Sequence, residues 1–210
     1  MAFGKESKKS DLKAYSLKIK TKDLPKPEFV VSERQGDKFI ELPEREDTIT
    51  GTLIGLEPKE TVWQGKTIKS VSATLTDGDQ IYFLTIPYSN IGRGLMNSLL
   101  NLQAFTDVQI GLYQTKPKTE GGKTYPAVSV RQADQIVRWK YENKDLPPPE
   151  EIKFKGEIMR DWSKMEAFMA DKLKEFNKVI KNTAPAKSKE VATAETDVAT
   201  ANDAELEPPF

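Results

Sequence analysis

The chain has 210 residues, 32 basic and 32 acidic side chains that cancel to a formal net charge of zero, and neither Cys nor His. The missing residue types exclude disulfides, thiol nucleophiles, zinc ligation by Cys and His, and acid/base catalysis by imidazole, so we expect a protein that is not an enzyme and needs no cofactor. No apolar run approaches the ~20 residues that span a bilayer, and the first ten residues lack the apolar stretch of a signal peptide, which predicts a cytoplasmic protein without a membrane partner.

Residues 1–47 are predicted to be a small β extension of a larger domain. Residues 14–20 alternate apolar and polar side chains, as a strand does. Residues 28–32 and 38–42 flank a turn that contains Gly36, which predicts a β-hairpin. We do not expect this extension to have a core of its own.

Residues 48–145 are predicted to form the main domain. Its first strand carries Gly51 and Gly55, which permit strong curvature, and the segment with Pro58, Trp63 and Gly65 is predicted to be a loop. The predicted elements, in order, are strands at 48–56, 67–76 and 80–86, a helix capped by Ser89 or Asn90 with apolar positions from Ile91 to Leu102, and strands at 107–115 and 124–131.

This β-β-β-α-β-β order over residues 48–131, with a curved first strand, resembles the OB-fold, a five-stranded Greek-key barrel. The resemblance implies a binding surface on the face of strands two and three and on the loops that join strands one to two and four to five. Proteins with this fold bind oligonucleotides, oligosaccharides or proteins, so the side chains in those loops must indicate which.

Both loops combine aromatic and cationic side chains, the pairing typical of single-strand grooves, where cations neutralise phosphates and flat rings stack on unpaired bases. Strand alternation places Tyr113, Tyr125 and Arg131 together on the face opposite the apolar positions. The predicted nucleic-acid-binding residues are Lys59, Trp63, Lys66, Lys69, Tyr82, Tyr113, Lys116, Lys118, Lys123, Tyr125 and Arg131.

Alternatives remain open for several of these residues. Trp63 can equally close one end of the core, and the lysines of the second loop can be ordinary solvated residues. Tyr82 and Phe83 are adjacent on one strand and must point to opposite faces, so only one of them faces inward.

The segment after the barrel contains a further run of aromatic and cationic residues. Residues 135–141 either widen the nucleic-acid path or pack against the next helix. Residues 146–150 are predicted to be a stiff, proline-rich spacer. An amphipathic helix is predicted from 157 to about 182, with Ile158, Trp162 and Met165 on its apolar stripe. It packs on its own barrel, associates with a second copy or presents a groove-binding face to a partner, and the first two are favoured.

Residues 183–210 are predicted to be a disordered acidic tail. Residues 190–210 carry six carboxylates and no Lys or Arg, a side-chain charge of −6, whereas the rest of the chain has 32 basic and 26 acidic residues, a charge of +6. A basic body with an acidic tail is a layout in which the tail can shield a site for polyanions. The alternative is a tail that only keeps the protein in solution.

The last eight residues resemble the acidic C-terminal tip of bacterial and phage single-stranded DNA-binding proteins, which end in acidic residues followed by Pro-Phe. This tip departs from the family pattern because it lacks a run of consecutive aspartates and contains Leu206. The resemblance implies that replication, recombination or repair proteins are recruited through Asp203, Glu205, Glu207, Pro208, Pro209 and Phe210.

These patterns predict a mainly β protein with an OB-fold-like barrel at 48–145, a spacer and helix at 146–182, and a function in coating and protecting single-stranded DNA. Stacking and phosphate contacts do not separate DNA from RNA. A first alternative is an OB-fold adaptor or virion-associated protein that binds protein and not DNA. A second is a metal-dependent nuclease that uses Asp77 and Asp79, although an Asp-Gly-Asp sequence is better explained as a turn.

Overall fold

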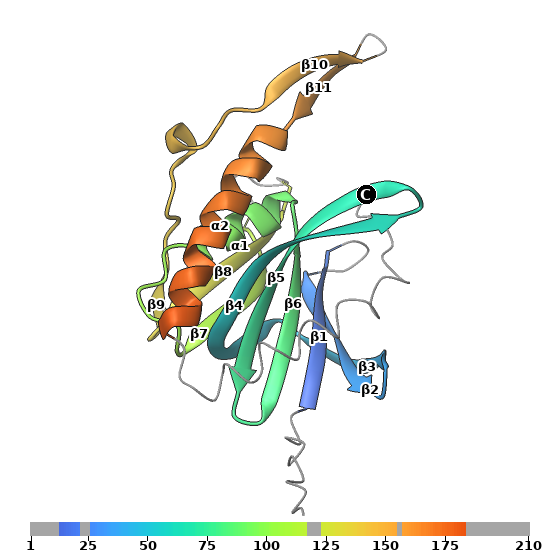
Figure 1. Ribbon diagram of the computed structural model, residues 1–210, viewed down its shortest axis with the longest axis vertical. Helices are drawn as coiled ribbons and strands as arrows, with labels where there is room; N and C mark the ends of the chain where they lie inside the picture. The colour runs from blue at the N-terminus through green and yellow to red at the C-terminus, as the bar shows by residue number, and fades with distance from the viewer. Residues whose placement is uncertain (1–12, 22–25, 117–122, 155–156, 184–210) are drawn as a thin grey trace, which may run out of the picture.

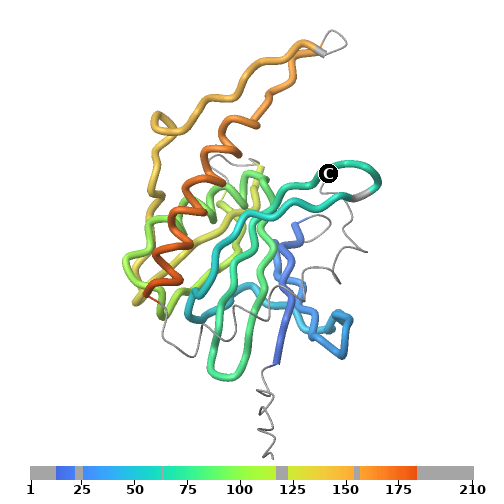
Figure 2. The backbone as a smooth tube through the Cα atoms, in the orientation of Figure 1, coloured from blue at the N-terminus to red at the C-terminus, as the bar shows by residue number. Residues whose placement is uncertain are grey.

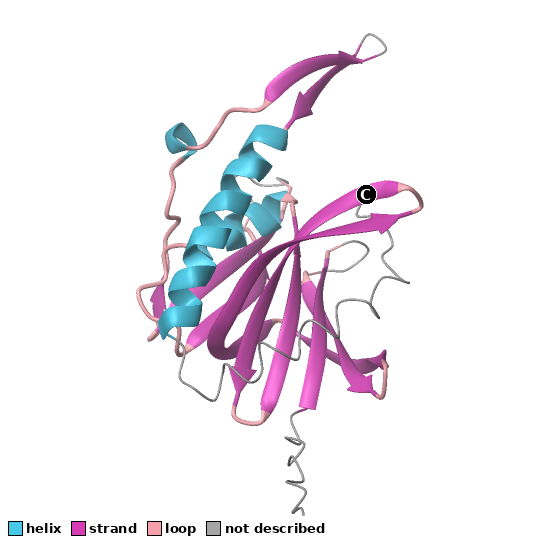
Figure 3. Ribbon diagram, viewed as in Figure 1, coloured by secondary structure: helices cyan, strands magenta, loops and turns pink. Residues whose placement is uncertain are grey.

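The structure is a computed structural model that describes residues 13–21, 26–116, 123–154 and 157–183, without the side chains of Trp63 and Phe154. Lys118 and the C-terminal tail with its tip therefore lie outside the described residues. The described part is mainly β, with a nine-stranded mixed sheet, a separate two-stranded hairpin and two α-helices (Figures 1 and 3). None of the described helices is long and apolar enough to cross a membrane.

The order of elements matches the predicted β-β-β-α-β-β core, preceded by three strands and followed by a hairpin and a long helix. The elements are β1 (Lys13–Lys20), β2 (Glu28–Gln35), β3 (Lys38–Glu46), β4 (Thr48–Trp63), β5 (Lys66–Asp77), β6 (Gln80–Pro87), α1 (Asn90–Leu99), β7 (Val108–Gln114), β8 (Pro126–Gln132), β9 (Gln135–Ile136), a 3-10 turn (Asn143–Asp145), β10 (Glu150–Phe154), β11 (Glu157–Asp161) and α2 (Ser163–Thr183).

The large sheet has the order β3-β2-β1-β6-β5-β4-β7-β8-β9 and does not close on itself within the described residues. The expected closed barrel is therefore not found. The free edge of β6 is occupied by the N-terminal strand β1, which runs parallel to it from Lys13 opposite Gln80 to Lys18 opposite Thr85. The other pairings are antiparallel, including the predicted hairpin of β2 and β3.

Strand β4 bends between two partners. Thr48 to Gly51 pair with β7, whereas Thr52 and the residues after it pair with β5, and the register shifts between Leu53 and Gly55. A Cβ atom at Gly51 would lie 2.8 Å from the Thr76 carbonyl oxygen, so only Gly permits this close approach of the two strands.

One face of the sheet bears the hydrophobic core, and we call it the core face, with the opposite side the outer face. Alternation along the strands places Leu53, Val71, Leu84, Ile110 and Val130 in the core cluster. Helices α1 and α2 contribute to the same cluster, with Leu95 and Leu99 from α1 and Met169 and Leu173 from α2. Figure 1 shows α2 lying over one face of the large sheet.

Ser89, one of the two predicted caps, begins α1, because its side chain accepts a hydrogen bond from the Gly92 N–H. Helix α2 packs along β4, the strand with which it makes its main contact. The buried Asn177 side chain accepts a hydrogen bond from the Leu56 N–H at 2.9 Å. This bond satisfies a backbone group on the edge of β4 that β7 leaves open.

Two expectations about elements are wrong. The predicted loop with Pro58 and Trp63 is a continuation of β4 and β5, which form a projecting arm with a two-residue turn at Gln64 and Gly65. The helix predicted from residue 157 begins at Ser163, because residues 157–161 instead form β11 and pair with β10. Figure 2 shows the β4–β5 arm and the β10–β11 hairpin projecting beyond the body of the protein.

Candidate nucleic-acid interface

The β7–β8 hairpin presents two tyrosines on the outer face. Val108, Ile110 and Leu112 are buried in the core, so the alternation of β7 directs Tyr113 outward. Tyr125 pairs with Thr115 through two hydrogen bonds, from the Thr115 N–H to its carbonyl oxygen and from its own N–H to Thr115 Oγ1. The Tyr113 and Tyr125 side chains are 46% and 61% exposed, so both rings are accessible to a ligand.

Small residues lie on the outer face between these two rings and Arg131. Tyr113 lies opposite Ala127, and Gly111 lies opposite Ser129, where a Cβ at Gly111 would be 3.2 Å from Ser129 Oγ. Arg131 follows on the same face and is exposed. The predicted grouping of Tyr113, Tyr125 and Arg131 on one face is therefore what the strand register gives.

Lys116 and Lys123 lie at the two ends of the loop that joins β7 to β8, and both are exposed. No ion pair involves either side chain within the described ranges. Two cations therefore stand next to the exposed tyrosines. This is the arrangement in which phosphates and bases of a single strand are contacted together.

The β4–β5 arm carries two further cations on its outer face. Lys59 lies opposite Ser70, one position from the core residue Val71, and Lys66 lies opposite Trp63. The arm turns at Gln64 and Gly65, whose φ values of 48° and 75° belong to a tight hairpin turn. The Trp63 side chain is outside the described residues, so its predicted role stays a prediction.

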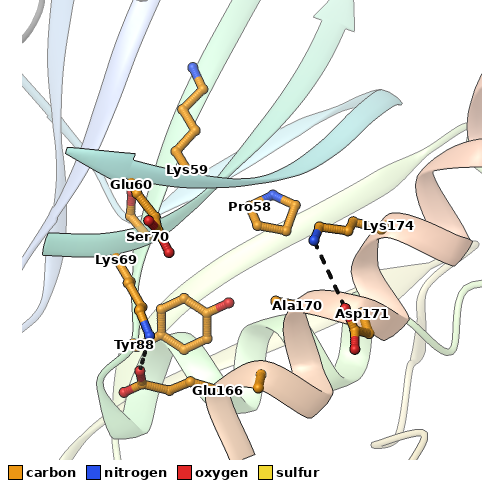
Figure 4. Close-up of a pocket in the computed structure, with 11 residues that line it drawn as sticks. Pro58, Lys59, Glu60, Lys69, Ser70, Tyr88, Glu166, Ala170, Asp171 and Lys174 are labelled. Carbon is orange, nitrogen blue, oxygen red and sulfur yellow. Dashed lines mark ion pairs between the residues drawn. The ribbon is translucent and has the colours of Figure 1, made fainter. Parts of the chain in front are cut away.

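Lys69 lies on the opposite side of the arm. It is three positions from Lys66, an odd step that reverses the side-chain direction in a strand. Its Nζ atom lies 3.6 Å from Glu166 Oε2 of α2. Figure 4 shows Lys69 directed at Glu166 and Lys59 directed away from the helix, so the structure separates two lysines that the sequence grouped together.

The hollow between the arm and α2 also contains Tyr88. Burial raises the pKa of Tyr88 to about 12, and the nearby carboxylates Glu166 and Glu60 add to that increase. Lys174 pairs with Asp171 in the same hollow, at 3.9 Å. Its mixed charges do not favour a polyanion.

Tyr82 does not lie with the other predicted contacts. It is on the core face of β6 with Leu84, whereas Phe83 points the other way and packs with Ile54 and Ile81. Its ring stacks on Tyr15 with centroids 5.4 Å apart, and its hydroxyl donates a hydrogen bond to Gln80. Burial raises the pKa of Tyr82, and nearby carboxylates, with Asp77 first, raise it further.

A second aromatic and cationic cluster lies over α1. The sequence indicated Trp139, in the run at 135–141, but not its grouping with Arg93 and Trp162. The Arg93 guanidinium lies 4.3 Å from the centroid of the Trp162 ring, and Trp139, 54% exposed, packs against Gly94. Tyr141 instead packs edge-on against Phe168 of α2, which supports the packing alternative for this residue. Arg93 and Trp162 are far apart in sequence, so no local pattern could have joined them.

Carboxylates gather nowhere in the described ranges in a group of three or more that could hold a metal ion. Asp77 and Asp79 flank Gly78, whose φ is 60°, in the turn between β5 and β6. Comparison of the chain with protein-family models, with curated proteins and with solved structures found no match.

Proposed function

We propose that this protein binds single-stranded DNA along the outer face of the β7–β8 hairpin and the β4–β5 arm. The observation that carries the proposal is the pair of exposed rings, Tyr113 and Tyr125, beside Lys116 and Lys123 and on the same face as Arg131. Unpaired bases stack on flat rings, each worth about 1–3 kcal/mol, while cations neutralise the phosphates. A duplex keeps its bases stacked internally and cannot use the rings.

The strand order supports an OB-type origin for this surface. Strands β6-β5-β4-β7-β8 follow the order 3-2-1-4-5 of an OB-fold, with the helix between the third and fourth strands and a bulged first strand shared by two partners. In that fold the first and last connections form the binding surface, and they correspond here to the β4–β5 arm and the β7–β8 loop. The departure is that β1 occupies the edge of β6 where the barrel would close.

The acidic tail, outside the described residues, completes the proposal. Its charge of −6 complements the +6 of the remaining chain, so in this proposal the tail occupies the basic surface when no DNA is bound and is displaced when DNA binds. The segment with Glu205, Glu207 and Phe210, which combines carboxylates with an aromatic ring, is then a docking segment for replication, recombination or repair proteins that have a basic, apolar pocket.

The test is a titration of a fluorescent thymidine oligonucleotide of about 30 residues, followed by anisotropy at several salt concentrations, with its duplex in parallel. We expect salt-sensitive binding to the single strand alone, weakened at least ten-fold when Tyr113 and Tyr125 are both changed to Ala. Tyr82→Phe is the matched control, because Tyr82 lies on the core face, and it should bind as the wild type does.

A variant that ends at Asp203 should bind the oligonucleotide as tightly as the full chain or more tightly, because it lacks part of the competing tail. Absence of single-strand binding at low salt would overturn the proposal and favour an adaptor that binds protein alone. Equal binding of single strand and duplex would also contradict it, since stacking on Tyr113 and Tyr125 requires unpaired bases.

A further inference from the structure

The β10–β11 hairpin stands apart from the core of the protein. Within the described residues β10 pairs with β11 alone, and neither strand belongs to the large sheet. The base of the hairpin is tied to α2 by an ion pair of Glu150 with Lys164 and by two hydrogen bonds from Ser163 to Asp161. Beyond that base the two strands project from the body (Figures 1 and 2).

Three large apolar side chains of this hairpin are exposed. Ile152 and Met159 lie opposite each other on one face and are 47% and 54% exposed, and Ile158 on the other face is 62% exposed. A two-stranded sheet is marginally stable in water, and a third or fourth strand is the usual means of stabilising it. No other strand among the described residues pairs with the outer edge of β10, so that edge is available for one.

The sequence of β10, Glu-Glu-Ile-Lys-Phe, is self-complementary in one antiparallel register. A two-fold axis perpendicular to the sheet keeps each side chain on its own face, so residues of the same parity must lie opposite each other. When the axis passes through Ile152, Glu151 of each copy lies opposite Lys153 of the other, and Ile152 lies opposite itself.

The registers centred on the charged residues of β10 place like charges together. An axis through Glu151 sets two glutamates face to face, and an axis through Lys153 sets two lysines face to face. Along β11, an axis through Met159 pairs Glu157 with Asp161 of the second copy, and an axis through Ile158 sets Glu157 opposite Met159 without joining opposite charges within the strand. The register of β10 centred on Ile152 joins two pairs of opposite charge, Glu151 with Lys153 in both directions, and charge complementarity therefore favours it.

We propose that two copies of this chain associate through their β10 strands, in the register centred on Ile152, to form a four-stranded sheet β11-β10-β10-β11. The new sheet satisfies the free edge of β10 with main-chain hydrogen bonds. It also gathers Ile152 and Met159 of both copies on one apolar face. The contact involves five residues of each copy, so we expect a weak dimer with a Kd between about 10 µM and about 1 mM.

Charge reversals test the register without DNA present, which keeps this test independent of the proposed function. Glu151→Lys and Lys153→Glu each place like charges opposite each other, and each should weaken the dimer about ten-fold or more by sedimentation equilibrium. An equimolar mixture of the two single variants should form a heterodimer, because both cross-strand pairs are then of opposite charge. Glu157→Lys on β11 is the control and should leave the dimer unchanged.

A cysteine placed at the axis provides a second readout. The chain has no Cys, so Ile152→Cys introduces a single thiol, and the two copies of residue 152 face each other at a Cβ separation of about 4.5–5.5 Å, close to what a disulfide needs. We expect mild oxidation to give a covalent dimer. Met159→Cys on the same face should not crosslink, since its two copies lie three strand spacings, about 14 Å, apart.

These measurements distinguish the proposed β10 dimer from a monomer and from other registers. A wild type that stays monomeric up to about 1 mM, a dimer that is unaffected by both single charge reversals, or crosslinking of Met159→Cys as readily as of Ile152→Cys would each overturn the proposal. Hetero-association of the two charge variants together with selective crosslinking through residue 152 would establish both the strand and the register.

Discussion

Asn177 is a single polar residue that joins α2 to the sheet. Its side chain is buried, accepts a hydrogen bond from the Leu56 N–H, and donates one to Glu57. Burial raises the pKa of Glu57, but hydrogen bonds from Lys181 and Asn177 outweigh that effect, so the pKa lies below its usual range. Asn177 and Lys181 of α2 thus stabilise the charged form of Glu57.

We expect Asn177→Ala to reduce the free energy of unfolding by about 1–3 kcal/mol, because the Leu56 N–H is left buried without a partner. Urea denaturation followed by circular dichroism measures the change. Lys178→Ala, an exposed neighbour on the same helix, is the matched control and should stay within about 0.5 kcal/mol of the wild type. Equal stability of the Asn177 variant would show that water replaces the lost contact.

Tyr88 makes stability depend on pH in the alkaline range. Its pKa in the folded protein is raised to about 12 by burial and by Glu166 and Glu60, above the value of 10.0 for a free tyrosine. The folded state thus favours the protonated phenol, and the stabilisation is complete below pH 10 and is lost as pH rises toward 12. After allowance for the exposed part of the ring, the loss is about 1 kcal/mol.

Tyr88→Phe cannot ionise, so we expect its stability to fall less steeply than that of the wild type between about pH 10 and about pH 12. The comparison uses urea denaturation at a series of pH values, with the tyrosinate absorbance of both proteins recorded alongside. Parallel stability curves for the two proteins would contradict a raised pKa at this site.

Helix α1 contains two glycines, Gly92 and Gly94, that face different surroundings. A Cβ at Gly92 would lie 1.7 Å from the Pro87 carbonyl oxygen, whereas a Cβ at Gly94 would lie 3.5 Å from Trp139 Cζ2, an ordinary contact. By intrinsic helix propensity alone, both glycines weaken the helix. The structure therefore requires Gly at position 92, whereas position 94 has room for a methyl group.

We therefore expect opposite effects from the same substitution two positions apart. Gly92→Ala should destabilise the protein by about 3 kcal/mol or prevent folding, because the backbone at Pro87 must move. Gly94→Ala should stabilise it by about 0.5–1 kcal/mol through helix propensity. Thermal unfolding measures both, and a stabilised Gly92 variant would mean that the start of the helix shifts at little cost.

Alternation of side chains predicted the strands of the large sheet well. Two local patterns gave wrong elements: Pro58, which indicated a loop, and the helical spacing from Ile158. Pro58 indicated a loop, yet it lies within β4 at the edge that β7 leaves open. Since the Leu56 N–H points to α2, the strand turns the Pro58 nitrogen the same way, where no ladder hydrogen bond is lost. The parallel pairing of β1 with β6 joins distant segments, and no local pattern encodes it.

The spacing of Ile158, Trp162 and Met165 fits a helix, but Asp161, two residues before the start of α2, was the better indicator of where the helix begins. Its carboxylate accepts hydrogen bonds from the Ser163 N–H and hydroxyl, which lower the pKa of Asp161 and begin α2 at Ser163. Among the candidate contacts, strand parity placed Tyr113, Tyr125 and Arg131 correctly on one face. Parity applied to Lys69, three residues after Lys66, would also have separated those two lysines.

At the scale of the whole molecule, the sheet divides the described residues into two unlike sides. The core face is covered by α2, and Lys69 on that face is paired with Glu166 of the helix. The outer face carries Lys59, Lys66 and the exposed tyrosines. If the outer face is the DNA path, the salt dependence of binding must report on lysines of that face and not on those facing the helix.

This division gives a quantitative prediction that rests on the proposed function. Each phosphate neutralised on a single strand contributes about −0.7 to the slope of log K against log salt concentration. Lys59→Ala and Lys66→Ala should each reduce the magnitude of that slope by about this amount, whereas Lys69→Ala should leave it unchanged because Glu166 already neutralises Lys69. Anisotropy titrations across a salt series measure all three variants. A change for Lys69→Ala as large as that for Lys66→Ala would show that DNA follows the α2 side of the arm, and the path would then run through the hollow at Tyr88 instead of across the outer face.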